Sequence, residues 1–347
     1  MKIALITDQH FGVRKGHRLY FDYYEKFYAN VFFPELQKRN IKTVVDLGDT
    51  FDNRKSIDFL SLSKAKEIFY DPARELGINI EMLIGNHTAF YKNTNVVNSP
   101  DLLLGEYENI KTYYEVEDIL IGNLQVTMLP WINSENEKQV MKHIRNSKSD
   151  ILFGHLELNG FVAHVGHTFD GGLDKTVFSK YERVFSGHFH HKSTQGNVTY
   201  LGNPYHLYWN DYGESRGFHI FDTETYELEF ILNPYSIFMK FHYDDVENNY
   251  DEYDFSNYRD CYTKVYVQRR EDAYTFDKVI QMLYDSGAYE VKVIEDSDYI
   301  DEVEEINVEA EDTLSLLQSY LDEVNYKDTS SLKKTIKSLY LEALEMS

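Results

Sequence analysis

Five short apolar runs in the first 190 residues are each followed by side chains of the kinds that bind metal ions. The runs have the length and the β-branched or aromatic content of buried strands. They are residues 2–7, 43–47, 79–84, 151–153 and 183–185, followed by Asp8-Gln9-His10, Gly48-Asp49-Thr50-Phe51-Asp52, Gly85-Asn86-His87, Gly154-His155 and Gly187-His188-Phe189-His190. Because the carboxyl ends of strands line the ligand crevice of an open α/β sheet, we expect these side chains to converge.

Helical patterns separate the early strands. Tyr20, Tyr24, Phe27 and Val31 recur at helical spacing, and residues 65–76 do the same before Gly77, a residue typical of helix ends. Further strand-like runs cover 119–128, 198–201, 218–221 and 228–232. This alternation predicts an α/β fold with helices packed outside layered sheets.

The ligand-type residues at the strand ends define a chemistry. The donors are carboxylates, imidazoles and one amide, with no thiolate, a set that suits manganese, iron or zinc. Seven donors exceed the needs of one tetrahedral site, and two divalent ions would suit hydrolysis of a phosphate diester. The seven are Asp8, His10, Asp49, Asn86, His155, His188 and His190.

Each motif has an ordinary explanation when it stands alone. Gly-Asp-x-x-Asp is usually a turn with a helix cap, and His-x-His is common in strands without a metal. Five such motifs in this order, each at a strand end, favour a metal site.

This order of motifs resembles the calcineurin-like metallophosphoesterase family. The resemblance implies a four-layer αββα sandwich. It further implies that Asp8, His10 and His190 hold one metal, that Asn86, His155 and His188 hold the other, and that Asp49 bridges the two. His87 would be the catalytic histidine. Two positions depart from the family pattern, since Thr88 replaces an acidic residue and Asp52 replaces a histidine found in archaeal and eukaryotic members.

Longer stretches are similar to one branch of that family, the SbcD-type nuclease subunits and their T-even phage counterparts. Among them are residues 49–55, 91–93, 129–131, 154–161, 186–190 and 216–224. The resemblance implies a DNA exonuclease and endonuclease of recombination, repair and end processing, with manganese or magnesium as cofactor. It also implies a coiled-coil, SMC-like ATPase partner and a homodimer within a heterotetramer.

The net charge of −23 argues against simple electrostatic attraction to DNA. The charge is uneven, however, because residues 243–312 contain 22 acidic and 6 basic residues. Basic residues do occur in the loops that follow metal-binding strands, where they could contact phosphate. These candidates are Arg14, Lys15, Arg54, Lys55 and Lys92. We therefore expect weak DNA binding by the chain alone.

We divide the sequence into a nuclease domain (1–239), an α/β capping domain (240–294), an acidic linker (295–312) and a helical segment (313–347). The linker has ten acidic residues and no basic residue. Two amphipathic patterns follow it and read as a docking element for the ATPase. The residues expected to contact the partner are Leu314, Leu317, Leu321, Leu332, Ile336 and Leu339.

A single cysteine, Cys261, excludes an internal disulfide and fits a reducing compartment. No run reaches the ~18 apolar residues of a spanning helix, so we expect a cytoplasmic protein with no membrane contact. Three alternatives stay open. The chain could be a non-catalytic or weakly catalytic adaptor of the same complex, a small-molecule phosphodiesterase or protein phosphatase of the same fold, or a pure DNA-binding module.

Overall fold

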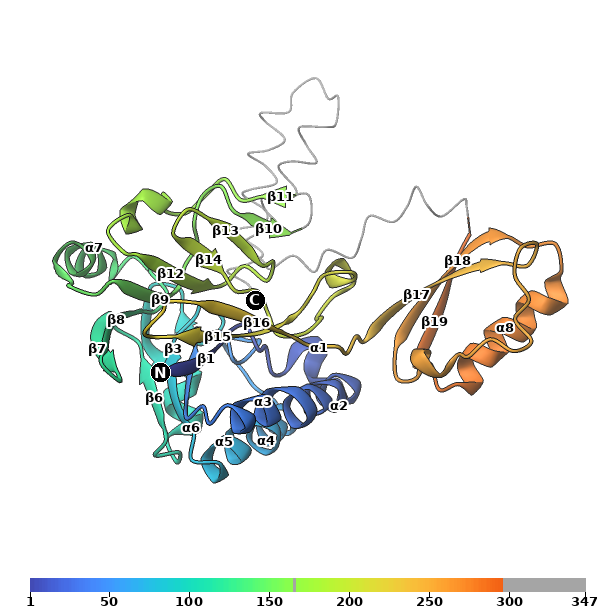
Figure 1. The fold of residues 1–347 in the computed structure, drawn as a ribbon, viewed down its shortest axis with the longest axis horizontal. Helices are drawn as coiled ribbons and strands as arrows, with labels where there is room; N and C mark the ends of the chain where they lie inside the picture. Colours follow the sequence, from blue (N-terminus) through green and yellow to red (C-terminus); the bar gives the residue numbers. More distant parts are fainter. Residues whose placement is uncertain (165–166, 296–347) are drawn as a thin grey trace, which may run out of the picture. The chain divides into compact units, whose positions relative to one another are not determined.

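A computed structural model of the chain describes residues 1–164 and 167–295 (Figure 1). The helical segment 313–347 and most of the acidic linker lie outside the described residues. The six apolar residues expected to contact an ATPase are therefore still a prediction.

The first sheet has six strands in the order β16-β15-β1-β2-β3-β6. Strands β1, β2, β3 and the edge strand β6 run parallel, whereas β15 pairs antiparallel with β1 and the other edge strand, β16, pairs antiparallel with β15. Their bounds are β1 Lys2–Ile6, β2 Thr43–Asp46, β3 Asn79–Leu83, β6 Ile110–Tyr113, β15 Gly217–Asp222 and β16 Leu228–Leu232.

The second sheet also has six strands, in the order β13-β14-β12-β9-β8-β7. Strands β14, β12, β9 and β8 are parallel, and the two edge strands are antiparallel. Their bounds are β7 Glu117–Ile121, β8 Leu124–Leu129, β9 Ile151–His155, β12 Arg183–Gly187, β13 Ser193–Gln195 and β14 Val198–Tyr200.

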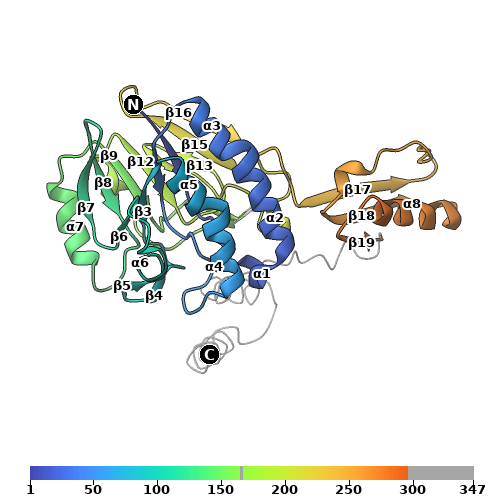
Figure 2. The same ribbon diagram turned by 90° about the horizontal axis from the view of Figure 1, so that it is seen from below.

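Alternating side chains explain why the two sheets stack. Ile3 and Leu5 of β1 face the second sheet and pack with Phe153 and Phe185, whereas Ala4 and Ile6 face helices. Helices cover the outer face of each sheet, α2–α5 on the first and α7 on the second (Figures 1 and 2). Their bounds are α2 Arg18–Phe27, α3 Phe33–Lys38, α4 Phe59–Ala65, α5 Asp71–Glu75 and α7 Glu137–Asn146. The result is the expected four-layer αββα sandwich.

Shorter elements lie in the connections. They are α1 Val13–Gly16, α6 Ser99–Leu104, the hairpins β4 Ala89–Tyr91 with β5 Thr94–Asn98 and β10 Val162–His164 with β11 His167–Thr168, π-helical turns at Tyr28–Phe32 and Lys66–Tyr70, and 3-10 turns at Lys175–Phe178, Trp209–Asp211 and Ser256–Tyr258. No helix among the described residues is both long enough and apolar enough to cross a membrane.

A smaller three-stranded parallel sheet follows the sandwich. Strands β17 Phe238–Asp244, β18 Tyr262–Arg269 and β19 Glu290–Ile294 pair in that order, and α8 Ala273–Asp285 packs on one face through a separate apolar core. Strand β17 begins at Phe238, so the boundary expected at 239/240 falls inside this strand. The division into a nuclease and a capping domain is still a prediction.

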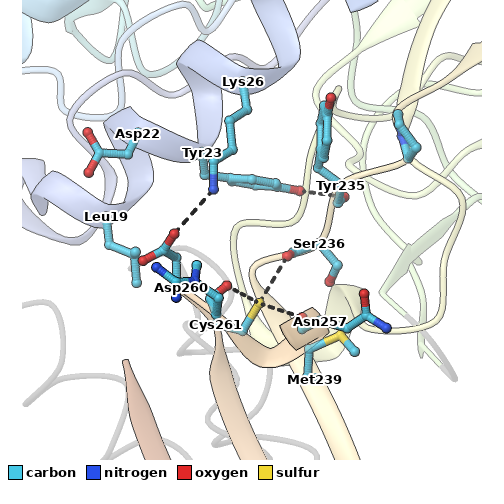
Figure 3. A pocket seen from close by; sticks show the side chains of 12 residues that line it. Leu19, Asp22, Tyr23, Lys26, Tyr235, Ser236, Met239, Asn257, Asp260 and Cys261 are labelled. Carbon is cyan, nitrogen blue, oxygen red and sulfur yellow. Dashed lines mark hydrogen bonds and ion pairs between the residues drawn. The ribbon is translucent and has the colours of Figure 1, made fainter. Parts of the chain in front are cut away.

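The small sheet contacts α2 beside a cavity of about 320 Å³ (Figure 3). The Tyr23 hydroxyl donates a hydrogen bond to the Tyr235 carbonyl (3.1 Å), and Lys26 Nζ lies 3.4 Å from Asp260 Oδ2. Cys261 lines the same cavity and is a free, buried thiol.

One expected strand was wrong. The run 119–128 is a hairpin, because Gly122 takes a left-handed φ of 60° and turns the chain between β7 and β8. Helix α7 and strands β6 and β17 were not expected at all.

Candidate metal centre

The carboxyl ends of five strands meet where the two sheets adjoin. Strands β1, β2 and β3 contribute from the first sheet, and β9 and β12 from the second. Four of the candidate ligands, Asp8, His10, Asp49 and His188, have a φ between 48° and 90°, in the left-handed region. Such conformations are rare for residues with a Cβ and are concentrated at functional sites.

The first group of donors is Asp8, His10 and His190. Their ligand atoms lie within 4.8 Å of one another. The two Nε2 atoms of His10 and His190 are 3.0 Å apart, and Asp8 Oδ1 lies 3.9 Å from His10 Nε2. Asp8 is fully buried, and burial raises the pKa of its carboxyl group. A divalent cation would offset this cost of burying a charge.

The second group surrounds Asn86, the amide expected to be a ligand. Its Oδ1 lies 2.9 Å from His155 Nε2 and 3.0 Å from His188 Nδ1. Asp49 Oδ2 is 3.1 Å from His155 Nε2, and Asp49, His155 and His188 form a second cluster of converging donors. The seven predicted ligands thus fall into two adjacent groups.

Two glycines allow the ligands to approach so closely. A Cβ on Gly85 would lie 2.1 Å from Asp49 Oδ1, and a Cβ on Gly187 would lie 3.0 Å from Asp8 Oδ2 and 2.0 Å from Thr7 Oγ1. A larger residue at position 85 would displace the Asp49 carboxylate, and one at position 187 would displace the Thr7 hydroxyl and crowd Asp8.

Buried opposite charges stabilise the second group in the absence of metal. Burial alone would raise the pKa of Asp49, but His155 and His87 outweigh it, so the pKa is lowered well below the usual range. Burial opposes a charge on His155, yet Asp49 raises its pKa to about 9. Metal would have to displace a proton from this imidazole.

The tautomer of His155 shows that the site fits a metal. Its Nδ1 lies 2.7 Å from the Leu47 carbonyl oxygen, an acceptor, so Nδ1 must carry a hydrogen. In the neutral ring the lone pair then lies on Nε2, which faces Asn86 and Asp49. Metal-binding histidines are commonly oriented in this way. Together with an all nitrogen and oxygen donor set, this arrangement is compatible with divalent metal ions.

His87 lies beside the first group. Its ring centroid is 4.9 Å from that of His10, and its Nδ1 lies 2.6 Å from the Asp52 carbonyl oxygen. Its backbone N–H donates to Asp49 Oδ1 at 2.8 Å. The loop is closed by Thr88, whose hydroxyl accepts a hydrogen bond from the Gly85 N–H (2.9 Å). Thr88 therefore replaces the usual acidic residue with a local hydrogen bond.

Other residues at the site carry weaker sequence signals. Asp52 Oδ1 lies 3.2 Å from His10 Nδ1, and Glu157 Oε1 lies 3.6 Å from His188 Nε2. The Trp131 ring centroid is 5.1 Å from that of His188. Asp52, Trp131 and Glu157 all fall within stretches that resemble the nuclease family, although none of the three was among the predicted ligands.

Arg216 donates a hydrogen bond to the backbone of the predicted ligand His190. Its Nη1 donates hydrogen bonds to the His190 carbonyl and to Asn203 Oδ1. Its Nη2 lies 2.7 Å from both Asp211 Oδ1 and Glu214 Oε2, and the side chain is only 4% exposed. This guanidinium connects a metal-ligand loop to a distant turn.

The structure places the predicted DNA-binding residues in loops after the metal-binding strands. Arg14, Lys15, Lys55 and Lys92 are exposed and Arg54 is half-buried. Arg14 and Lys15 occupy left-handed positions in α1, four to five residues after His10.

Comparison with known proteins adds a relative that aligns along most of the chain. Exonuclease subunit 1 of Enterobacteria phage T4 is 32% identical over 314 residues, which cover 89% of this chain and 90% of the relative. The chain belongs to this family of nuclease subunits. The SbcD subunit of the nuclease SbcCD from Staphylococcus epidermidis is 23% identical over 271 residues, 66% of this chain and 67% of that protein.

Solved structures give lower similarity. An archaeal phosphodiesterase has 15% identity and a TM-score of 0.36, covering 67% of this chain and all of that one. The calcineurin-like phosphoesterase YfkN from Bacillus subtilis has 12% identity and a TM-score of 0.34, covering 66% of this chain and 87% of that one. No family model matches the sequence.

Proposed function

We propose that this chain is a two-metal DNA phosphodiesterase with exonuclease and endonuclease activity. It acts in recombination, repair and end processing as the nuclease subunit of a complex with a coiled-coil ATPase. The observation that carries the proposal is the pair of adjacent donor groups. Membership of a nuclease-subunit family supports DNA as the substrate.

The ligand assignment is the one that the family resemblance implies, and the two donor groups support it. Asp8, His10 and His190 would hold one ion, Asn86, His155 and His188 the other, and Asp49 would bridge. Two bound divalent ions, manganese or magnesium, would stabilise the charge on the phosphate diester and lower the pKa of water. Asp49 Oδ2 faces His155 and its Oδ1 accepts a hydrogen bond from the His87 N–H, so the orientation of this carboxylate is fixed.

His87 would act on the leaving group. Because the Asp52 carbonyl can only accept, Nδ1 of His87 is the donor in their 2.6 Å contact, and this fixes the ring orientation. Protonated on Nε2 as well, the ring would donate to the leaving oxygen or to the transition state. The backbone carbonyl of residue 52 thus orients His87, whichever side chain residue 52 carries.

The activity test uses the purified chain with manganese on linear duplex and single-stranded DNA, with and without the ATPase. We expect metal-dependent cleavage that is lost with EDTA and in the Asp49→Asn variant. Intact DNA under all conditions, with tight manganese binding, would instead favour an adaptor. Hydrolysis of cyclic nucleotides without cleavage of DNA would favour a small-molecule phosphodiesterase.

We also propose a homodimer within the complex. Support comes from exposed apolar side chains in two regions. One is the start of α4, and the other is the β4–β5 hairpin with α6. Phe59 is 93%, Leu102 72% and Val96 65% exposed. Such surfaces often mark interfaces.

Light scattering should find that the wild-type chain is a dimer and that the double variant Phe59→Ser, Leu60→Ser is a monomer. The control variant Leu120→Ser, at a side chain that is 71% exposed, should remain a dimer. A wild-type monomer at all concentrations would contradict this proposal.

A further inference from the structure

The indole ring of Trp131 lies at the edge of the metal centre, beside the second group of donors. Its centroid is 5.1 Å from that of His188, with the two planes tilted by 48°, and 6.1 Å from that of His155. The side chain is half-buried. A large ring with part of its surface open to solvent thus borders the residues that would hold the second ion.

This ring has no part in the apolar cores of the molecule. Trp209, the other tryptophan of the chain, packs against the core between the first sheet and its helices, and Ile132 packs against the core under α7. In residues 1–164 and 167–295, Trp131 belongs to none of the four apolar cores. Because apolar ring area in contact with water is unfavourable, core packing does not explain a tryptophan at this position.

The backbone of Trp131 is fixed from both sides. Its N–H donates a hydrogen bond to the Ile84 carbonyl (2.8 Å), just after β3 and two residues before Asn86. Its carbonyl oxygen accepts hydrogen bonds from Asn95 Nδ2 (2.8 Å) and Asn136 Nδ2 (2.9 Å). The ring is therefore carried by a loop that is tied to the metal-binding strand end, as a group that positions a substrate must be.

An aromatic face at this place suits a nucleobase. Bases of any sequence stack on aromatic side chains, because every base has a π-face. A base is joined to its phosphate through a single sugar, and the indole lies next to His188. A phosphate held at the second group would therefore carry its base to the ring. Bases inside a duplex are already stacked, so the base that reaches Trp131 must be unpaired.

We propose that Trp131 stacks on the base of the nucleotide next to the cleaved phosphate and so positions the strand on the metal centre. This inference rests on the proposed function, because it assigns a substrate-binding residue to that nuclease. The ligand is identified by its chemistry, an unpaired nucleobase on a phosphate diester. Stacking of this kind is tolerant of base identity but requires that a base be present.

Equilibrium binding of short, fluorescein-labelled oligothymidylates to the full-length chain tests this proposal. The titrations use the His87→Ala variant with magnesium, which suppresses cleavage and keeps the predicted metal ligands. One probe is intact, and each of the others has an abasic residue at a different position. We expect an abasic residue at one position to weaken binding by about 5- to 150-fold, the usual contribution of one stacked base, and little effect at the others.

Two substitutions at residue 131 are compared in this background. Trp131→Leu removes the aromatic face, so this variant should bind the intact probe as weakly as its parent binds the sensitive abasic probe, and should no longer distinguish the two. Trp131→Phe is the matched control, because it keeps a ring and should keep most of the discrimination. Calorimetric titration with manganese should give the parent's affinity for both variants, because the backbone contacts of residue 131 remain.

Intrinsic fluorescence provides a second readout. The chain has two tryptophans, so Trp209→Phe leaves Trp131 as the single indole. The intact probe should then quench the tryptophan emission, whereas the sensitive abasic probe should not. Equal quenching by both probes would contradict stacking of that base on the ring.

Three binding results would overturn the proposal. They are equal affinity for all the probes, a Trp131→Leu variant that still discriminates between them, and a loss of manganese affinity in Trp131→Leu with discrimination unchanged, which would show that the ring only supports His188. None of these titrations depends on cleavage. A base preference in a chain that cleaves no DNA would contradict the proposed function alone, whereas metal-dependent cleavage without a base preference would contradict this inference alone.

Discussion

Nδ1 of His155 lies 2.7 Å from the carbonyl oxygen of Leu47, so the end of β9 is tied to the end of β2. This contact joins the two sheets at the metal centre and directs Nε2 toward Asn86. We predict that His155→Ala lowers manganese affinity at least 10-fold, since it removes a ligand and this tie. Isothermal titration with manganese measures the change. His242→Ala, at an exposed position of β17, is the control, and equal affinities in the two variants would contradict the assignment.

His87→Ala should separate catalysis from metal binding. The contact to Asp49 comes from the backbone N–H of residue 87 and survives the substitution. We therefore expect the cleavage rate to fall by about 10²–10⁴-fold, the usual contribution of a general acid, with manganese affinity nearly unchanged. Single-turnover cleavage and titration measure the two quantities. A rate equal to that of wild type would exclude the proposed role.

Arg216→Met should destabilise the fold and weaken the first metal group. The substitution leaves the carboxylates of Asp211 and Glu214 without their cation, and breaking a buried pair costs about 3–5 kcal/mol in free energy of unfolding. Urea unfolding measures this cost. Arg74→Met removes a half-exposed ion pair with Asp71 and should cost at most about 1 kcal/mol. If both variants lose a similar free energy of unfolding, the ion pairs of Arg216 do not stabilise the fold as a buried pair would.

Stability at acid pH should depend on His219. Burial lowers the pKa of this imidazole to about 3, and its Nδ1 has no hydrogen-bond partner within the described residues. Between pH 3 and 6.5 the unfolded chain binds a proton that the native chain does not, so the free energy of unfolding decreases as the pH falls. One proton contributes about 1.4 kcal/mol per pH unit.

His219→Leu should therefore make the acid dependence shallower by about 1.4 kcal/mol per pH unit. Urea unfolding in EDTA at a series of pH values measures the slope for both chains. His143→Leu serves as the control, since His143 is partly exposed and pairs with Asp118. Parallel slopes in wild type and His219→Leu would mean that His219 is accessible to protons in the native state.

The sequence predicted the centre of the fold well, because the five metal motifs coincide with strands that are buried on both faces. Strands such as β1 and β9 have almost no exposed residue, so a continuous apolar run identifies them. The convergence of the donors followed from strand polarity, since parallel strands present their carboxyl ends at one edge. Their division into two groups came from the family resemblance.

Features that depend on tertiary pairing were harder to predict. Strand β6 has one fully buried residue, Tyr113, and α7 buries only Val140 and Ile144, so neither has a strong apolar period. The link from Arg216 to His190 spans 26 residues and has no motif. The adjacency of Lys240, Lys264 and Lys292 in the small sheet could not be predicted either, because these residues become neighbours only through strand register.

Anomalous diffraction from crystals of the chain grown with manganese tests the central claim most directly. The account predicts two manganese peaks ~3.5–4 Å apart, with Asp49 between them. Asp8, His10 and His190 should bound one peak, and Asn86, His155 and His188 the other. A single peak, or peaks away from these strand ends, would contradict the two-metal centre.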